Sequence, residues 1–73
     1  MLDMKQQVVN LVRQIDDLNG EIENHWNMIR KSISDGQVDG AISLLNAYLR
    51  LKTKLTVTES TLAGTLGGYF SDK

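Results

Sequence analysis

The stretch SISDGQVDG, residues 32–40, decides the fold of this chain. Its centre, Asp35-Gly36, is a dipeptide that favours a turn. Ser34 and Asp39 are each suited to cap a helix that starts here, and both starts remain open. The stretch therefore predicts that the chain reverses near residue 35 and that a second helix follows.

Before this stretch, apolar side chains follow a heptad repeat that has Met1 at position a. A regular a/d pattern is typical of helices packed at coiled-coil angles. The next positions of the same register fall on Ser32, Gly36 and Asp39, so we expect the first helix to end there and to span about 3–33. Its polar exception is a histidine, which can fix register or oligomeric state. The predicted oligomer seam consists of Val8, Leu11, Ile15, Leu18, Ile22, His25 and Ile29.

Asn19-Gly20 is a second turn signal, but the heptad spacing does not change across it. Leu18 and Ile22 remain in register, and Gly20 falls on the solvent side of the helix. A glycine there costs about 1 kcal/mol relative to alanine and leaves the packing intact. We expect one continuous helix, and a three-helix fold broken at 19–20 is the alternative.

The second half of the chain has its own repeat of seven residues. It begins at Ala41 and continues through Tyr48, Leu55, Leu62 and Tyr69. We expect a helix over about 37–66, with Gly64 and then Gly67-Gly68 ending it. The chain then divides into a helical hairpin, 1–66, and a short glycine-initiated tail, 67–73.

The predicted fold class is all-α, an antiparallel two-helix hairpin with heptad seams. A chain of 73 residues has a thin core and usually needs disulfides, a metal, oligomerisation or very regular helix packing. It contains no cysteine and one histidine, which excludes disulfides and a Cys/His zinc site. We therefore expect the hairpin to form a four-helix-bundle-like homodimer or a higher oligomer.

Composition narrows the class of function. The net charge is −1, so no strong field attracts nucleic acid or an anionic membrane. No apolar run approaches the roughly 20 residues of a membrane span, and the lack of cysteine suits the cytoplasm. No catalytic residue, cofactor or metal site is predicted, because the sequence has no cysteine nucleophile or phosphate-binding loop, and the Glu21/His25 pair lacks further ligands.

These exclusions favour a non-catalytic protein–protein interaction module that binds itself and an unidentified protein. Small cysteine-free proteins of this kind typically act as adaptors, assembly chaperones or stoichiometric inhibitors, including those carried by phages and other mobile elements. Binding would use an exposed apolar helix face, because large apolar side chains dominate interface energies. The candidate partner-binding residues are Trp26, Ile33, Tyr48, Tyr69 and Phe70.

Two other functions remain open from the sequence. One is a nucleic-acid-binding hairpin dimer, which would contact phosphate through basic side chains. Its candidate residues are Arg30, Lys31, Arg50, Lys52 and Lys54. The other is a structural component of an oligomer, such as a filament or a ring.

Overall fold

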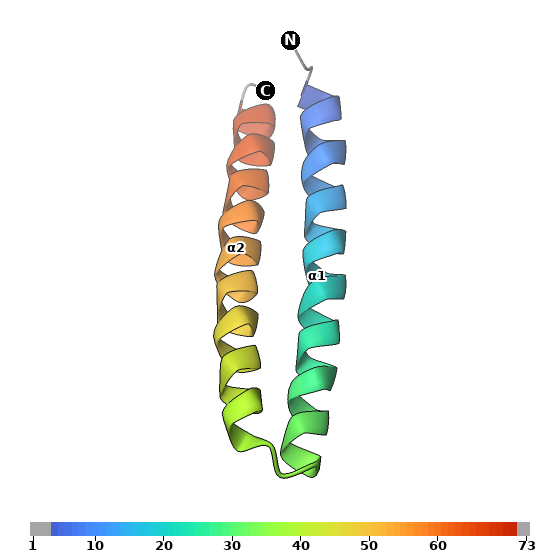
Figure 1. The fold of residues 1–73 in the computed structure, drawn as a ribbon. Coiled ribbons are helices and arrows are strands. Elements are labelled where there is room, and N and C mark those ends of the chain that lie inside the picture. The colour runs from blue at the N-terminus through green and yellow to red at the C-terminus, as the bar shows by residue number, and fades with distance from the viewer. Residues whose placement is uncertain (1–3, 72–73) are drawn as a thin grey trace.

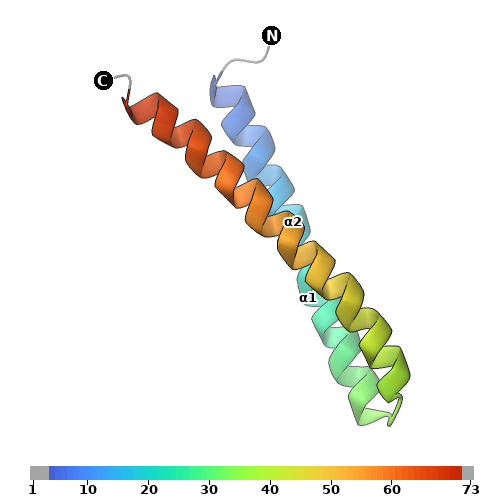
Figure 2. The same ribbon diagram turned by 90° about the vertical axis from the view of Figure 1, so that its left-hand side faces the viewer.

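The computed structural model describes residues 4–71, and its side chains up to residue 68. Two helices, α1 (Met4–Ser34) and α2 (Val38–Ser71), form an antiparallel hairpin that measures 56 × 17 × 15 Å. They lie side by side, with their free ends at the same end of the molecule (Figure 1). Figure 2 shows that they cross and then diverge away from the turn. The predicted all-α two-helix hairpin is confirmed.

Helix α1 runs without interruption through Asn19-Gly20. Gly20 has no positive φ, so its backbone conformation is open to any L-residue. A Cβ atom built on Gly20 meets nothing within 4 Å, which places this glycine on the open side of the helix. The continuous helix is confirmed, and the three-helix alternative is wrong.

The reversal occurs at Asp35-Gly36, as predicted. The amide of Gly36 donates to the carbonyl of Ile33 at 3.1 Å, and the amide of Gln37 donates to the carbonyl of Ser32 at 2.8 Å. This pair of bonds is a Schellman motif, which requires a left-handed residue after the helix. Gly36 supplies it with φ = 77°.

Helix α2 starts within one residue of the predicted position 37, but its capping residue and its C-terminal end differ from the prediction. The carbonyl of Gln37 accepts the amide of Ala41 at 3.0 Å, so Gln37 is the N-cap rather than Ser34 or Asp39. Helix α2 continues past residue 66 to Ser71, so residues 67–71 extend the helix rather than start a separate tail.

The glycines expected to end α2 do not do so, for a reason visible in their backbone. Gly64, Gly67 and Gly68 have no positive φ, and a helix-ending glycine needs one. Leu62 and Leu66 are half-buried on the same turns. Packing of these leucines against α1 offsets the poor helix propensity of glycine.

The threonine-rich stretch TKLTVTEST, 53–61, is helical although threonine is a poor helix former. Its threonine hydroxyls donate to the carbonyl four residues earlier, at 2.9–3.1 Å, and Thr65 repeats the pattern. Because each hydroxyl is satisfied within the helix, Thr58 can lie buried in the contact with α1.

The core is thin and lies along the line where the helices meet. Leu18, Ile29 and Ala41 are its buried apolar residues, and no side chain of the described part is less than 2% exposed. The residues that we placed on the seam of α1 are buried or half-buried: Val8, Leu11, Ile15, Leu18, Ile22, His25 and Ile29. The contact between α1 and α2 therefore uses this row within a single chain.

Candidate interaction surface

Two opposed faces flank the contact between the helices. On one face the ring of Tyr48 contacts the indole of Trp26, with centroids 5.5 Å apart. The ammonium of Lys52 lies 5.8 Å from the centre of the same tyrosine ring. On the other face Glu21 and Lys54 line one groove. Since Glu21 and Trp26 are five residues apart, their side chains point about 140° apart on α1.

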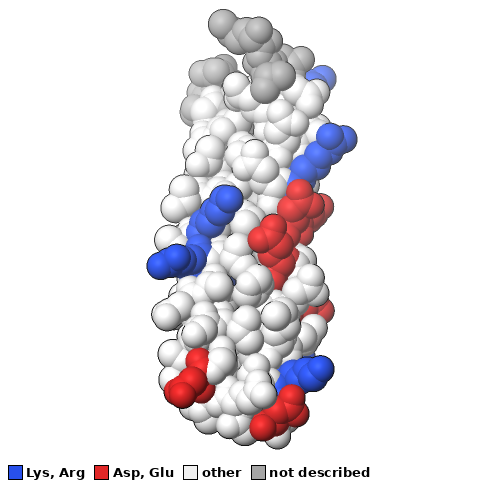
Figure 3. Space-filling model, viewed as in Figure 1, with Lys and Arg blue, Asp and Glu red and all other residues white. Residues whose placement is uncertain are grey.

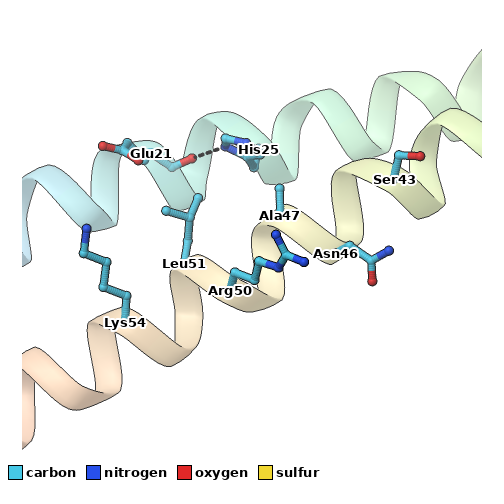
Figure 4. A pocket seen from close by; sticks show the side chains of 8 residues that line it. All are labelled: Glu21, His25, Ser43, Asn46, Ala47, Arg50, Leu51 and Lys54. Atoms are coloured by element: carbon cyan, nitrogen blue, oxygen red, sulfur yellow. Dashed lines mark hydrogen bonds between the residues drawn. The ribbon is translucent and has the colours of Figure 1, made fainter.

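The second face carries a shallow groove of about 470 Å³, which we call the polar groove because most of its lining residues are polar. Figure 3 shows the charge that surrounds it, with basic side chains of α2 beside acidic side chains of α1. Figure 4 shows the lining residues at close range, which come from both helices. These residues are Glu21, His25, Ser43, Asn46, Ala47, Arg50, Leu51 and Lys54.

His25 lies in this groove and bonds to the backbone of its own helix. Its Nδ1 lies 2.9 Å from the backbone carbonyl of Glu21, as the dashed line in Figure 4 marks. A carbonyl only accepts, so Nδ1 is the donor in this bond. The described residues contain no cluster of three or more His, Asp or Glu side chains placed to hold a metal.

The five predicted phosphate-contacting residues do not form one basic stripe. Arg50 and Lys54 share the polar groove with Glu21. Lys52 lies on the opposite face beside Tyr48, and Arg30 donates to the Asn27 side chain at 2.6 Å. Lys31 lies in the last turn of α1. Because strong nucleic-acid binders concentrate positive charge on one face, this dispersed arrangement argues against phosphate binding.

The face with Trp26 carries a patch of exposed apolar side chains next to the turn. Ile33 lies seven residues after Trp26, and on α2 a second row recurs at spacings of three and four residues, which places its members on one side. These side chains are between 39% and 54% exposed. We call this surface the turn-proximal patch, formed by Trp26, Ile33, Val38, Ile42, Leu45 and Leu49.

Part of this surface was predicted from the sequence. Trp26 and Ile33 were predicted and are exposed, whereas Tyr48 is half-buried beneath Trp26. The side chains of Tyr69 and Phe70 lie outside the described residues. The α2 half of the patch was missed: Val38, Ile42, Leu45 and Leu49. The sequence does contain a sign of this row, because apolar residues recur seven apart at 38 and 45 and at 42 and 49, next to the seam that starts at Ala41.

A second apolar surface lies at the far end of the hairpin. A pocket of about 320 Å³ is lined by Met4, Lys5, Val8, Val9 and Leu66. Between this pocket and the turn-proximal patch, the same rows carry the polar residues Asn19, Lys52 and Thr56, all exposed. The face is therefore apolar at both ends and polar in the middle.

Comparison with known proteins adds no family. No family model matches the chain, and neither the curated proteins nor the solved structures yield a match. Neither helix, over the residues described, has the length and apolar character needed to cross a membrane.

Proposed function

We propose that this chain is a small, non-catalytic, cytoplasmic protein-interaction module that binds through the turn-proximal patch. The observation that carries the proposal is the exposure of six large apolar side chains, including the single tryptophan, on one half of one face. Contiguous exposed apolar patches of this kind mark interaction sites in soluble proteins.

The chemistry of the patch supports protein binding over catalysis. Trp26 presents a large flat indole supported by Tyr48, which is the type of side chain that dominates binding energy at interfaces. The polar groove on the other face is open, and its histidine is engaged with its own helix. Adaptor, assembly chaperone and stoichiometric inhibitor are the roles that fit such a surface.

A comparative capture experiment tests this function. The wild-type chain and the double variant Ile42→Glu/Leu49→Glu are immobilised and exposed to extract of the native host, and bound proteins are identified by mass spectrometry. We expect specific partners to bind the wild type and to be lost with the double variant. The control is Val57→Glu, because Val57 is 59% exposed but lies outside the patch. Equal capture by all three proteins would refute the proposal.

A further inference from the structure

The hairpin exposes more surface than a chain of its size normally does. Its accessible surface is 5539 Å². A compact monomer of 8.2 kDa exposes about 4,500 Å². The excess of about 1,000 Å² is close to the roughly 800 Å² that each partner contributes to a standard interface. The single hairpin therefore leaves uncovered an area that one partner of similar size would cover.

We propose that a second copy of this chain covers the face that carries the turn-proximal patch, with the two turns at the same end of the complex. The dyad axis then runs along the hairpin, and α1 of each copy packs on α2 of the other. The result is a four-helix bundle with all neighbouring helices antiparallel. This inference rests on the proposed function, because it names the first occupant of the same surface.

The thin core is the first reason to choose a second copy. Only three apolar residues of the described chain are buried, none of them completely, and the sequence has no cysteine with which to form a disulfide. Oligomerisation is one of the ways in which small domains without such links gain stability. A second copy is present wherever the chain is made, so it supplies that burial without any other protein.

Apolar residues meet one another in this arrangement. Within one hairpin, residue n of α1 lies level with about residue 73 − n of α2, as the contact between Trp26 and Tyr48 illustrates. When both turns lie at one end, residue n of α1 in one copy also lies level with about residue 73 − n of α2 in the other copy. Trp26 then lies opposite Leu45 and Leu49 of the second copy, and Ile33 lies opposite Val38 and Ile42. Each half of the patch covers the other.

Charge selects this orientation over the reversed one. Glu23 lies one turn before Trp26, and Asp16 lies seven residues before Glu23, so both carboxylates project from the same face of α1. With the turns together, Lys52 of the second copy comes level with the span between them. With the hairpins reversed end to end, α1 packs on its own copy and Glu23 meets Asp16 twice. Like charges across an interface oppose that pairing.

Sedimentation measurements on the purified protein test the dimer. We expect the wild type and the Val57→Glu control to have twice the mass of the chain, and Ile42→Glu/Leu49→Glu to be monomeric with its helical circular dichroism retained. Monomeric wild type would overturn the inference, and so would a dimer that survives the double substitution. A monomeric wild type that still captured a partner through the patch would leave the proposed function standing.

A single label at the turn tests the orientation. Asp35 is exposed, and Asp35→Cys introduces a single site for the label because the natural chain has no cysteine. With the turns together, two labels lie within roughly 20 Å, which is two helix layers. With the hairpins reversed, they lie near the 56 Å length of the hairpin. A short distance from pulsed electron resonance supports the proposal, and a distance near the full length overturns it.

Charge reversal gives an independent test of the same orientation. We expect Lys52→Glu to weaken the dimer at least tenfold and Lys52→Glu/Glu23→Lys to restore it to within threefold of the wild type. A double variant as weak as the single one would contradict the proposed contact between copies. Because Lys52 also lies over Tyr48 within its own chain, Lys52→Gln serves as the control for that loss.

Discussion

Trp26 on α1 lies against Tyr48 on α2, with ring centroids 5.5 Å apart and planes inclined at 39°. The tyrosine is half-buried, whereas the indole remains 43% exposed. The pair therefore extends from the contact between the helices to the surface of the hairpin. One side of the indole is positioned by the fold, and the other is free to contact a partner. An indole held in this way loses little conformational entropy when a partner binds.

Tryptophan fluorescence should report occupation of the patch. The chain has one tryptophan, so its emission comes from a single site. We expect the emission maximum to shift to shorter wavelength as protein concentration rises, because a second copy covers the exposed indole. Acrylamide quenching should fall in parallel. Ile42→Glu/Leu49→Glu should show neither change, and a concentration-independent spectrum in the wild type would contradict the covering of Trp26.

Gly20 and Gly36 should respond to alanine in opposite directions. Gly20→Ala should raise the free energy of unfolding by about 0.5–1 kcal/mol, because the site is helical and a new Cβ meets nothing within 4 Å. Gly36→Ala should lower it by about 1 kcal/mol or more, since its φ of 77° strains any residue with a side chain. Urea denaturation followed by circular dichroism measures both. A destabilised Gly20→Ala variant would count against a straight, open helix at this site.

Thr58 should be a place where the core can be improved. It is 9% exposed, and its hydroxyl bonds to the carbonyl of Lys54. Thr58→Val replaces this hydroxyl with a methyl group, and the Lys54 carbonyl keeps its helical bond. We expect a gain of about 0.5–1 kcal/mol from the buried methyl.

Thr61→Val is the matched control for that substitution. Thr61 makes the same hydroxyl bond to the carbonyl four residues earlier but is exposed. Its substitution should change stability by less than about 0.5 kcal/mol. Equal effects in thermal melts of the two variants would show that burial of Thr58 does not matter.

The hairpin was predictable because two local signals agree. The heptad spacing survives Gly20 and fails at Gly36, so the periodicity identifies which glycine is the turn. The end of α2 was not predictable in the same way. Glycines at 64, 67 and 68 signal a stop, but half-buried leucines on the same turns keep the chain helical, and this tertiary contact is not part of the local pattern.

The interaction surface was only half visible in the sequence. Trp26 and Ile33 stand out because they broaden a strong seam on α1. The exposed row at Ile42 and Leu49 runs beside a seam that contains leucines of its own, and composition does not separate the two rows. Their separation depends on which row faces α1, and that is decided by the packing of the hairpin.

His25 should lower the stability of the hairpin relative to an apolar residue at the same position. It occupies a half-buried position among aliphatic neighbours of the seam, and its Nδ1 bonds to the carbonyl of Glu21. His25→Leu should raise the free energy of unfolding by about 1 kcal/mol, because apolar surface replaces a polar ring and the carbonyl keeps its helical bond. The histidine lies on the face opposite the turn-proximal patch, outside the proposed contact between copies. We therefore expect the variant to melt at a higher temperature and to sediment with the same mass as the wild type.

The control for His25 is its neighbour Asn24, which is exposed on α1. Asn24→Leu adds the same side chain outside the helix contact, and should change stability by less than about 0.5 kcal/mol. If His25→Leu is less stable than the wild type, the bond from His25 to the Glu21 carbonyl stabilises the hairpin more than burial of a leucine side chain does.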